Sequence, residues 1–289
     1  METFILQIMT GIANGGIYAI VGLAIVMIYR STDLINFAQG EMAMFSTYIA
    51  WSFLNIGFPF WAAFAGSLIL SFVAGMIIYK LTIAPLGKGN DLGIIVILIG
   101  LLIIFNSLAS WIWTPSLKTF PSPFPAWLQL GNLMSAHTFG SLLVTAAVLA
   151  ALFVLFKRTT LGLAMRAVAQ NPVSSQLVGL RVKWLLALGW GVSAAIGAVA
   201  GMLIAPVIYL EPNMMSGVLL YGICGAILGG LDNPAGAVVG GLIIGVLENV
   251  LGAYVIGNEL KFAMALAIIV AVLLVRPAGL FSSKIATRV

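Results

Sequence analysis

The sequence predicts an all-α polytopic membrane protein of eight or nine transmembrane helices, with the N-terminus outside and the C-terminus in the cytoplasm. Hydrophobic residues make up 62% of the chain and charged residues only 7%, whereas soluble domains carry roughly 25% charged residues. Apolar runs of about 20 residues, long enough to cross a ~30 Å hydrocarbon core, recur along the chain. Cations gather in alternate loops between these runs. We expect one domain over residues 1–289.

Nine apolar runs can be marked in order along the chain. Each carries few or no charges, and most are long enough to span a bilayer. Glycine supplies 32 of the 289 residues, as expected where transmembrane helices pack closely. The runs lie at 4–29, 37–55, 60–80, 92–113, 138–156, 184–209, 216–230, 236–254 and 260–275.

The loop charges orient the chain. If all nine runs cross, one side holds eleven cations and the other holds only Lys118 and Lys261. Because cytoplasmic loops are enriched in Lys and Arg, the richer side is predicted to be cytoplasmic. The eleven cations are Arg30, Lys80, Lys88, Lys157, Arg158, Arg166, Arg181, Lys183, Arg276, Lys284 and Arg288.

Two alternatives are open for residues 216–254. The run at 216–230 is short for a complete crossing. The two glycine-rich runs around Asp232-Asn233-Pro234 are therefore either a broken, re-entrant element that lines a path or two short helices joined by a tight turn. The glycines around this proline also indicate a very close approach of helices, or thin walls beside a cavity.

A basic segment at 157–183 holds five of the thirteen cations and no acidic residue. Residues 161–180 have plausible helical spacing, interrupted near Pro172. The segment either lies along the membrane surface or projects as a short helix into a groove on a cytoplasmic protein. We expect it to be a cytoplasmic coupling loop.

The long outer loop from Thr114 to His137 is rich in proline and tryptophan. Prolines exclude a regular helix, and tryptophans favour the membrane–water interface. The loop is either a simple interfacial connection or a docking surface for an external partner.

The residue pattern excludes most catalytic chemistry. The chain has one His and one Cys, so neither a metal cluster nor a Ser/His/Asp set is expected. The tripeptide Gly87-Lys88-Gly89 lacks the spacing and hydroxyl residue of a phosphate-binding loop. The chain is therefore not expected to be an enzyme or to need a cofactor, and any ATP-driven activity requires a separate subunit. No aromatic-interleaved basic patch suggests nucleic acid.

Polar residues inside the apolar runs are candidates for function, because charge inside a bilayer is costly. Glu41 either lines or gates a polar path, or is a first-turn carboxylate wetted near the cytoplasmic face. Glu248, with Asn249, is expected to pair with another helix or subunit. Asn106 is expected to form an interhelical hydrogen bond.

Four motifs, in order, resemble the branched-chain amino-acid ABC transporter permeases of the LivH type. Asn36–Glu41 (Asn-Phe-Ala-Gln-Gly-Glu) resembles their Asn-Phe-Ala-His-Gly-Glu motif. Thr160-Leu161-Gly162, with Arg166-Ala167 and Gly179, resembles their coupling segment. The glycine-rich block from Leu228 to Glu248 and the ending Arg276–Phe281 resemble their late motifs. The similarity covers essentially the whole chain.

The resemblance implies a permease subunit of an ATP-driven importer, in a bacterial inner membrane. Its implied partners are a second permease (LivM-type or a copy), two cytoplasmic ATPase subunits, an extracytoplasmic solute-binding protein and membrane lipid. It implies coupling residues Leu161, Gly162, Arg166, Ala167, Asn171, Pro172 and Gly179. It implies path or gate residues Asn36, Gln39, Gly40, Glu41, Gly229, Gly230 and Gly236.

Two points limit what the resemblance implies. Gln39 stands where the family usually has His, so a pH-titrating role there is not expected. Relatives with these motifs carry branched-chain amino acids, urea, short amides or aromatic acids, so the motifs do not name the solute. Rival interpretations are an ion-coupled secondary transporter that uses Glu41 or Glu248, a passive channel and a structural scaffold.

Overall fold

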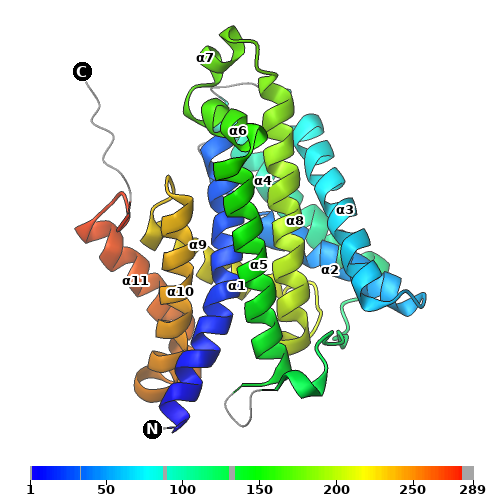
Figure 1. Ribbon diagram of the computed structural model, residues 1–289, viewed down its shortest axis with the longest axis vertical. Helices are drawn as coiled ribbons and strands as arrows, with labels where there is room; N and C mark the ends of the chain where they lie inside the picture. Colours follow the sequence, from blue (N-terminus) through cyan, green and yellow to red (C-terminus); the bar gives the residue numbers. More distant parts are fainter. Residues whose placement is uncertain (1, 33, 87–89, 130–133, 282–289) are drawn as a thin grey trace. The chain divides into compact units, whose positions relative to one another are not determined.

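The computed structural model describes residues 2–32, 34–86, 90–129 and 134–281 (Figure 1). Most of the chain within these ranges is helical, and an isolated β-bridge joins Lys118 to Leu210. Three of the cations used to orient the chain, Lys88, Lys284 and Arg288, lie outside the described residues.

The α-helices follow the apolar runs closely. They are α1 (Glu2–Thr32), α2 (Gln39–Asn55), α3 (Phe60–Ile78), α4 (Asp91–Trp113), α5 (Ala136–Arg158), α6 (Thr160–Gln170), α7 (Pro172–Leu177), α8 (Val182–Ile208), α9 (Met215–Gly229), α10 (Pro234–Leu251) and α11 (Lys261–Val275). Short π-helical turns extend α3 over Tyr79–Ile83 and α10 over Gly252–Ile256, and single 3₁₀ turns lie at Ala126–Leu128 and Asn258–Leu260.

Six helices in the described residues are long and apolar enough to cross a membrane. They span Thr3–Arg30, Phe60–Ile83, Asp91–Trp113, Ala136–Arg158, Val182–Ile208 and Pro234–Val255. Helices α9 and α11 are apolar but shorter. A polytopic helical membrane protein is therefore confirmed, while the count of eight or nine crossings and their orientation stay predictions.

The chain divides into two compact units. One comprises Met1–Val26, Phe124–Thr145 and Gly217–Val289, and the other comprises Met27–Pro123 and Ala146–Ser216. We call them the terminal unit and the central unit. The helices α1, α5 and α9 contribute residues to both.

In the central unit, α2 and α3 pack against α8. Gly75 of α3 lies so close to α8 that an added Cβ would meet the carbonyl oxygen of Trp190 at 2.7 Å. Gly191 of α8 makes the reciprocal approach to Phe72. Such small residues let the backbones of two transmembrane helices approach closely. Close packing matters here because no hydrophobic force drives helices together within lipid.

Helix α2 begins near the middle of α8 rather than beside its end. Residues 34–38, which precede α2, are not helical, and Asn36 turns them by accepting a hydrogen bond from the Ala38 backbone N–H at 3.0 Å. Gln39 then contacts Ser193, near the middle of the 27-residue α8. Further along, Thr47 lies against Gly201, so α2 runs beside the second half of α8 in the same direction.

In the terminal unit, α10 packs against α1 and α9 through glycine. A Cβ on Gly15 would meet the backbone of Leu242 at 2.9 Å, and a Cβ on Gly225 would meet Gly241 at 2.6 Å. Between α9 and α10, the residues Gly230 to Asn233 form a tight turn in which Asn233 N donates to Gly230 O at 3.0 Å. The predicted close approach is therefore confirmed, whereas the choice between a re-entrant element and two crossing helices stays a prediction.

Candidate functional site

A polar cluster surrounds Glu41 inside the central unit. Glu41 lies in the first turn of α2 and is only 6% exposed. The side-chain amide nitrogen of Asn106, on α4, lies 3.4 Å from its carboxylate. The same nitrogen donates to Pro212 O at 3.1 Å and to Asn213 Oδ1 at 2.9 Å. One amide therefore connects α2, α4 and the segment before α9, which confirms the interhelical hydrogen bond expected of Asn106.

The sequence left Glu41 with two alternatives, and both stay predictions. The carboxylate is in the first turn of α2, and it is buried beside an amide two-thirds of the way along α4. Within the described residues, the one ion pair joins Lys261 to Glu248, so the structure assigns Glu41 no cationic partner. A buried carboxylate without a cation is costly inside a membrane and usually functional.

Aromatic side chains pack beside this cluster. Tyr48 follows Glu41 by two turns of α2, and its ring stacks on Trp113 of α4 with centroids 5.0 Å apart. Phe45 contacts both Trp113 and Phe105 edge-on, at 5.2 Å in each case. Tyr48 is fully buried, and its hydroxyl has no hydrogen-bond partner in the part of the chain that the structure describes.

The other predicted path residues on α2 hold the start of that helix. Asn36, Gln39 and Gly40 are all buried. The Gln39 amide nitrogen donates to Ser193 O at 2.9 Å, and the Ser193 hydroxyl donates to Gln39 Oε1 at 3.2 Å. These residues lie in the same unit as Glu41, and Gln39 fixes the depth at which that carboxylate enters the helix bundle.

The predicted path glycines Gly229, Gly230 and Gly236 belong to the terminal unit. Gly229 and Gly236 face each other across the α9–α10 turn, where a Cβ on either would overlap the backbone of the other. Gly230 has φ +104°, a conformation that glycine adopts without strain. The ending after α11 covers this turn, because Leu280 N donates to Leu228 O at 2.8 Å and Asn233 Nδ2 donates to Phe281 O at 2.9 Å.

The predicted coupling segment forms two short helices, α6 and α7, beyond the ends of α5 and α8 (Figure 1). Thr159 caps α6 by accepting from Gly162 N at 3.0 Å. Asn171 caps α7 by accepting from Ser174 N at 3.0 Å, and Pro172 is its first residue. Gly179 ends the pair with φ +87°. The predicted interruption near Pro172 is confirmed.

These helices expose apolar side chains, of which the sequence analysis selected only Leu161. Leu163, Val173, Leu177 and Val178 are 60%, 63%, 84% and 78% exposed, and Leu161 is 38% exposed. We call these five residues the coupling surface. The other selected residues shape the segment: Gly162 is buried against the end of α5, and Arg166 and Ala167 are half-buried.

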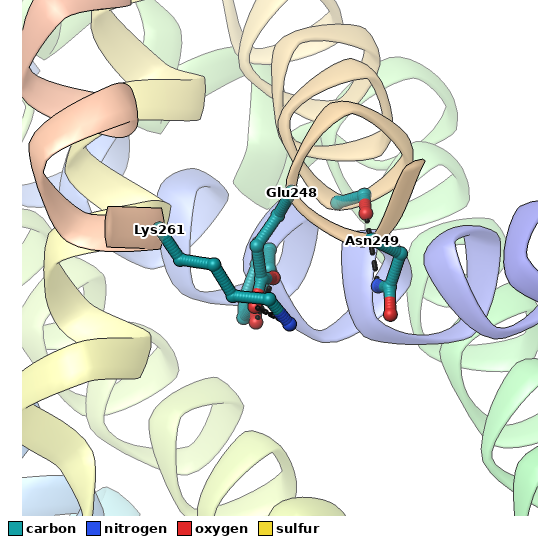
Figure 2. Close-up of polar contacts among 5 residues, drawn as sticks. Glu248, Asn249 and Lys261 are labelled. Atoms are coloured by element: carbon teal, nitrogen blue, oxygen red, sulfur yellow. Dashed lines mark hydrogen bonds and ion pairs between the residues drawn. The ribbon is translucent and has the colours of Figure 1, made fainter. Parts of the chain in front are cut away.

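A second intramembrane carboxylate lies in the terminal unit (Figure 2). Glu248 of α10 accepts a hydrogen bond from the Tyr18 hydroxyl at 2.7 Å, and its other oxygen lies 3.5 Å from Lys261 Nζ. The adjacent Asn249 donates back to Gly245 O of its own helix at 3.1 Å. The predicted pairing of Glu248 with another helix is confirmed.

Sequence reasoning missed the partners Tyr18, Lys261, Tyr48 and Asn213. Tyr18 and Tyr48 look like ordinary residues of apolar runs, and Asn213 lies in an unremarkable loop. Lys261 carried a usable signal, since it is a cation beside an apolar run that otherwise holds no charge. The carboxylate that it meets could not be chosen without the helix packing.

The described residues thus form a helical membrane protein with buried polar groups between its helices and an exposed apolar surface on the short helices α6 and α7. The chain belongs to the family described as "Branched-chain amino acid transport system / permease component", whose model matches residues 7–273.

Three curated relatives match over nearly their whole length. The chain is 29% identical to the high-affinity branched-chain amino acid transport system permease protein BraD of Pseudomonas aeruginosa and 28% identical to LivH of Escherichia coli K12, covering in each case 96% of this chain and 95% of the relative. It is 27% identical to a probable branched-chain amino acid transport permease protein LivH of Methanocaldococcus jannaschii, covering 93% and 90%. The resemblance drawn from the four motifs is thereby confirmed.

One solved structure has a similar fold. It is PsaBC from Streptococcus pneumoniae in complex with Fab, with a TM-score of 0.50 and 13% sequence identity over 91% of this chain and 89% of that chain. At this identity the match shows only the fold. The helix arrangement of this chain is therefore shared with a protein of very different sequence.

Proposed function

We propose that this chain is the permease subunit of an ATP-binding-cassette importer that carries branched-chain amino acids across the bacterial inner membrane. The observation that carries the proposal is the family match over residues 7–273. Curated relatives named as branched-chain amino acid permeases align with 96% of the chain. The chain forms part of the translocation path and catalyses no bond chemistry.

Energy comes from separate subunits. The sequence has no phosphate-binding loop, so two cytoplasmic ATPase subunits supply the hydrolysis. The coupling surface is where they dock. Its five side chains are apolar and exposed at the tips of two short helices, where an ATPase groove can enclose them. An exposed apolar patch flanked by basic residues is typical of a protein interaction site.

The proposed topology follows the loop charges. The N-terminus lies outside, and the coupling surface and C-terminus lie in the cytoplasm. The six long helices, with the shorter α9 and α11, supply eight crossings. The segment from residue 34 to the end of α2 supplies the ninth crossing, which the placement of the two ends on opposite sides requires, and its helical part begins beside the middle of α8.

Three further partners complete the importer. A second permease, of LivM type or a copy of this chain, completes the membrane part, and an extracytoplasmic solute-binding protein delivers the amino acid. In the central unit, the translocation path is lined or gated by Asn36, Gln39, Gly40 and Glu41. Residues Gly229, Gly230 and Gly236 set the α9–α10 approach in the terminal unit.

Uptake into proteoliposomes tests the proposal. The full complex, supplied with binding protein and internal ATP, should accumulate radiolabelled leucine, and unlabelled isoleucine or valine should compete. Omission of the ATPase subunits should abolish uptake. Competition by urea, short amides or aromatic acids but not by valine would assign another solute, and uptake driven by a pH gradient without ATP would assign secondary transport.

A further inference from the structure

Three oxygen atoms of the central unit are gathered around a single nitrogen. The Asn106 amide nitrogen lies within hydrogen-bond distance of a Glu41 carboxylate oxygen, the Pro212 carbonyl and the Asn213 side-chain oxygen, at 3.4, 3.1 and 2.9 Å. We call these three oxygens the acceptor tripod. An amide nitrogen has two hydrogens, so Asn106 cannot satisfy all three acceptors at once.

The acceptor with the longest contact is the ionisable one. Glu41 accepts the longest of the three contacts although it is an ionisable group only 6% exposed. The α2 helix dipole lowers the cost of a carboxylate in its first turn, but it supplies no cation. A primary ammonium group has three N–H donors and a positive charge, and it matches the tripod in both number and sign.

The surroundings suit a ligand that joins such an ammonium to an aliphatic group. Phe45 follows Glu41 by four residues on α2, and Phe105 directly precedes Asn106 on α4. The two rings are half-buried and contact each other. The buried Tyr48 hydroxyl is a further polar group without a partner among the described residues.

We propose that the α-ammonium group of the transported amino acid displaces the Asn106 amide from the acceptor tripod of Glu41, Pro212 and Asn213 during its passage. Asn106 closes the tripod when the path is empty. The inference rests on the proposed function, since it names the part of the substrate that the path recognises. Binding is weak and transient, because the Asn106 amide competes for the same oxygens.

Ligand-observed saturation-transfer NMR on the complete permease–ATPase complex in lipid nanodiscs, without the binding protein, tests this directly. Leucine should give a signal, and 2-hydroxy-4-methylpentanoate, in which a hydroxyl replaces the ammonium, should give one about tenfold weaker. Glu41→Gln should weaken the leucine signal about tenfold. Glu259→Gln, which removes an exposed carboxylate, is the matched control and should leave it unchanged.

Asn106→Ala separates a substrate site from a structural latch. Emptying the tripod removes the competitor, so leucine binding should equal or exceed that of the wild type. A latch would lose binding in Asn106→Ala and Glu41→Gln alike, and that result would overturn the proposal. So would a leucine signal that appears only when the binding protein is present, because the leucine would then be held by that protein rather than by the permease.

A milder variant covers the case in which Glu41→Gln does not assemble. Asn213 is exposed, and Asn213→Ala removes one acceptor, so leucine binding should fall about threefold. Asn55→Ala, at an exposed position near the end of α2, should have no effect. Equal binding by all these variants in a complex that still accumulates leucine would refute the tripod alone, whereas absence of leucine uptake by the wild type would refute the proposed function.

Discussion

Gln39 and Ser193 exchange two hydrogen bonds: the Gln39 amide donates to the Ser193 carbonyl at 2.9 Å, and the Ser193 hydroxyl donates to Gln39 Oε1 at 3.2 Å. Both residues are fully buried or nearly so. The exchange holds the first residue of α2 beside the middle of α8. As a result the carboxylate of Glu41, two residues later, is placed inside the central unit rather than at its edge.

Gln39→Leu should destabilise the protein by about 1–2 kcal/mol, because it removes both bonds and leaves the buried Ser193 hydroxyl without one of its partners. The thermal midpoint of the purified complex should fall. Gln7→Leu makes the same chemical change at a partly exposed position of α1 and should leave the midpoint unchanged. An unchanged midpoint for Gln39→Leu would show that other contacts fix the start of α2.

Lys261→Met should destabilise the terminal unit by about 1–3 kcal/mol, because it leaves the buried Glu248 carboxylate without its cation. The double variant Lys261→Met/Glu248→Gln should lose less than the sum of the two single losses, by about 1 kcal/mol. Chemical or thermal unfolding of all four proteins measures this coupling. Strict additivity would mean that the 3.5 Å pair contributes nothing.

Gly240→Ala should cost about 3 kcal/mol or more, because the new Cβ would overlap the Gly225 carbonyl of the facing helix. Gly100→Ala is a matched control, since Gly100 is also inside a long apolar helix but its Cβ would meet nothing within 4 Å. That control should stay within about 1 kcal/mol of the wild type. Folded yield and thermal midpoint in detergent compare the two. Similar losses would argue against glycine-mediated packing of α9 and α10.

Leu163→Asp should reduce co-purification of the ATPase subunits about tenfold, because it places a charge in the coupling surface without touching the packed side of α6. The helix content of the permease should not change, since the side chain is 60% exposed. Leu117→Asp, at a 67% exposed position of the outer loop, should retain the ATPases. If both variants retain the ATPase subunits, Leu163 is not part of the interface.

Much of this fold could be predicted from hydropathy and helix-breaking residues. The apolar runs anticipate the long helices within a few residues, and Pro172 marks the boundary between α6 and α7. The glycines near Pro234 indicate the close approach of α9 and α10, because only glycine permits backbones to lie so close. These features depend on local sequence, so they can be predicted from this sequence alone.

The depth of α2 and the identity of polar partners could not be predicted. Hydropathy does not distinguish a helix that starts at the membrane surface from one that starts beside the middle of α8. The contact of Asn106 with Glu41 joins residues 65 positions apart, and that of Tyr18 with Glu248 joins residues 230 apart. Only the packing of the helices brings such pairs together. The exposure of Leu163, Val173, Leu177 and Val178 could not be predicted either, because it depends on how α6 and α7 pack.

Photo-crosslinking at Leu177 is the most direct test of the central claim that this permease is driven through α6 and α7. Leu177 is 84% exposed, so the fold should tolerate benzoylphenylalanine at this position. On irradiation of intact membranes, the probe should form an adduct with the nucleotide-hydrolysing subunit. The same probe at Leu117 should give no such adduct. If the Leu177 probe forms adducts only with lipid while the complex still accumulates leucine, ATP hydrolysis is not coupled to transport through α6 and α7, and the central claim is wrong.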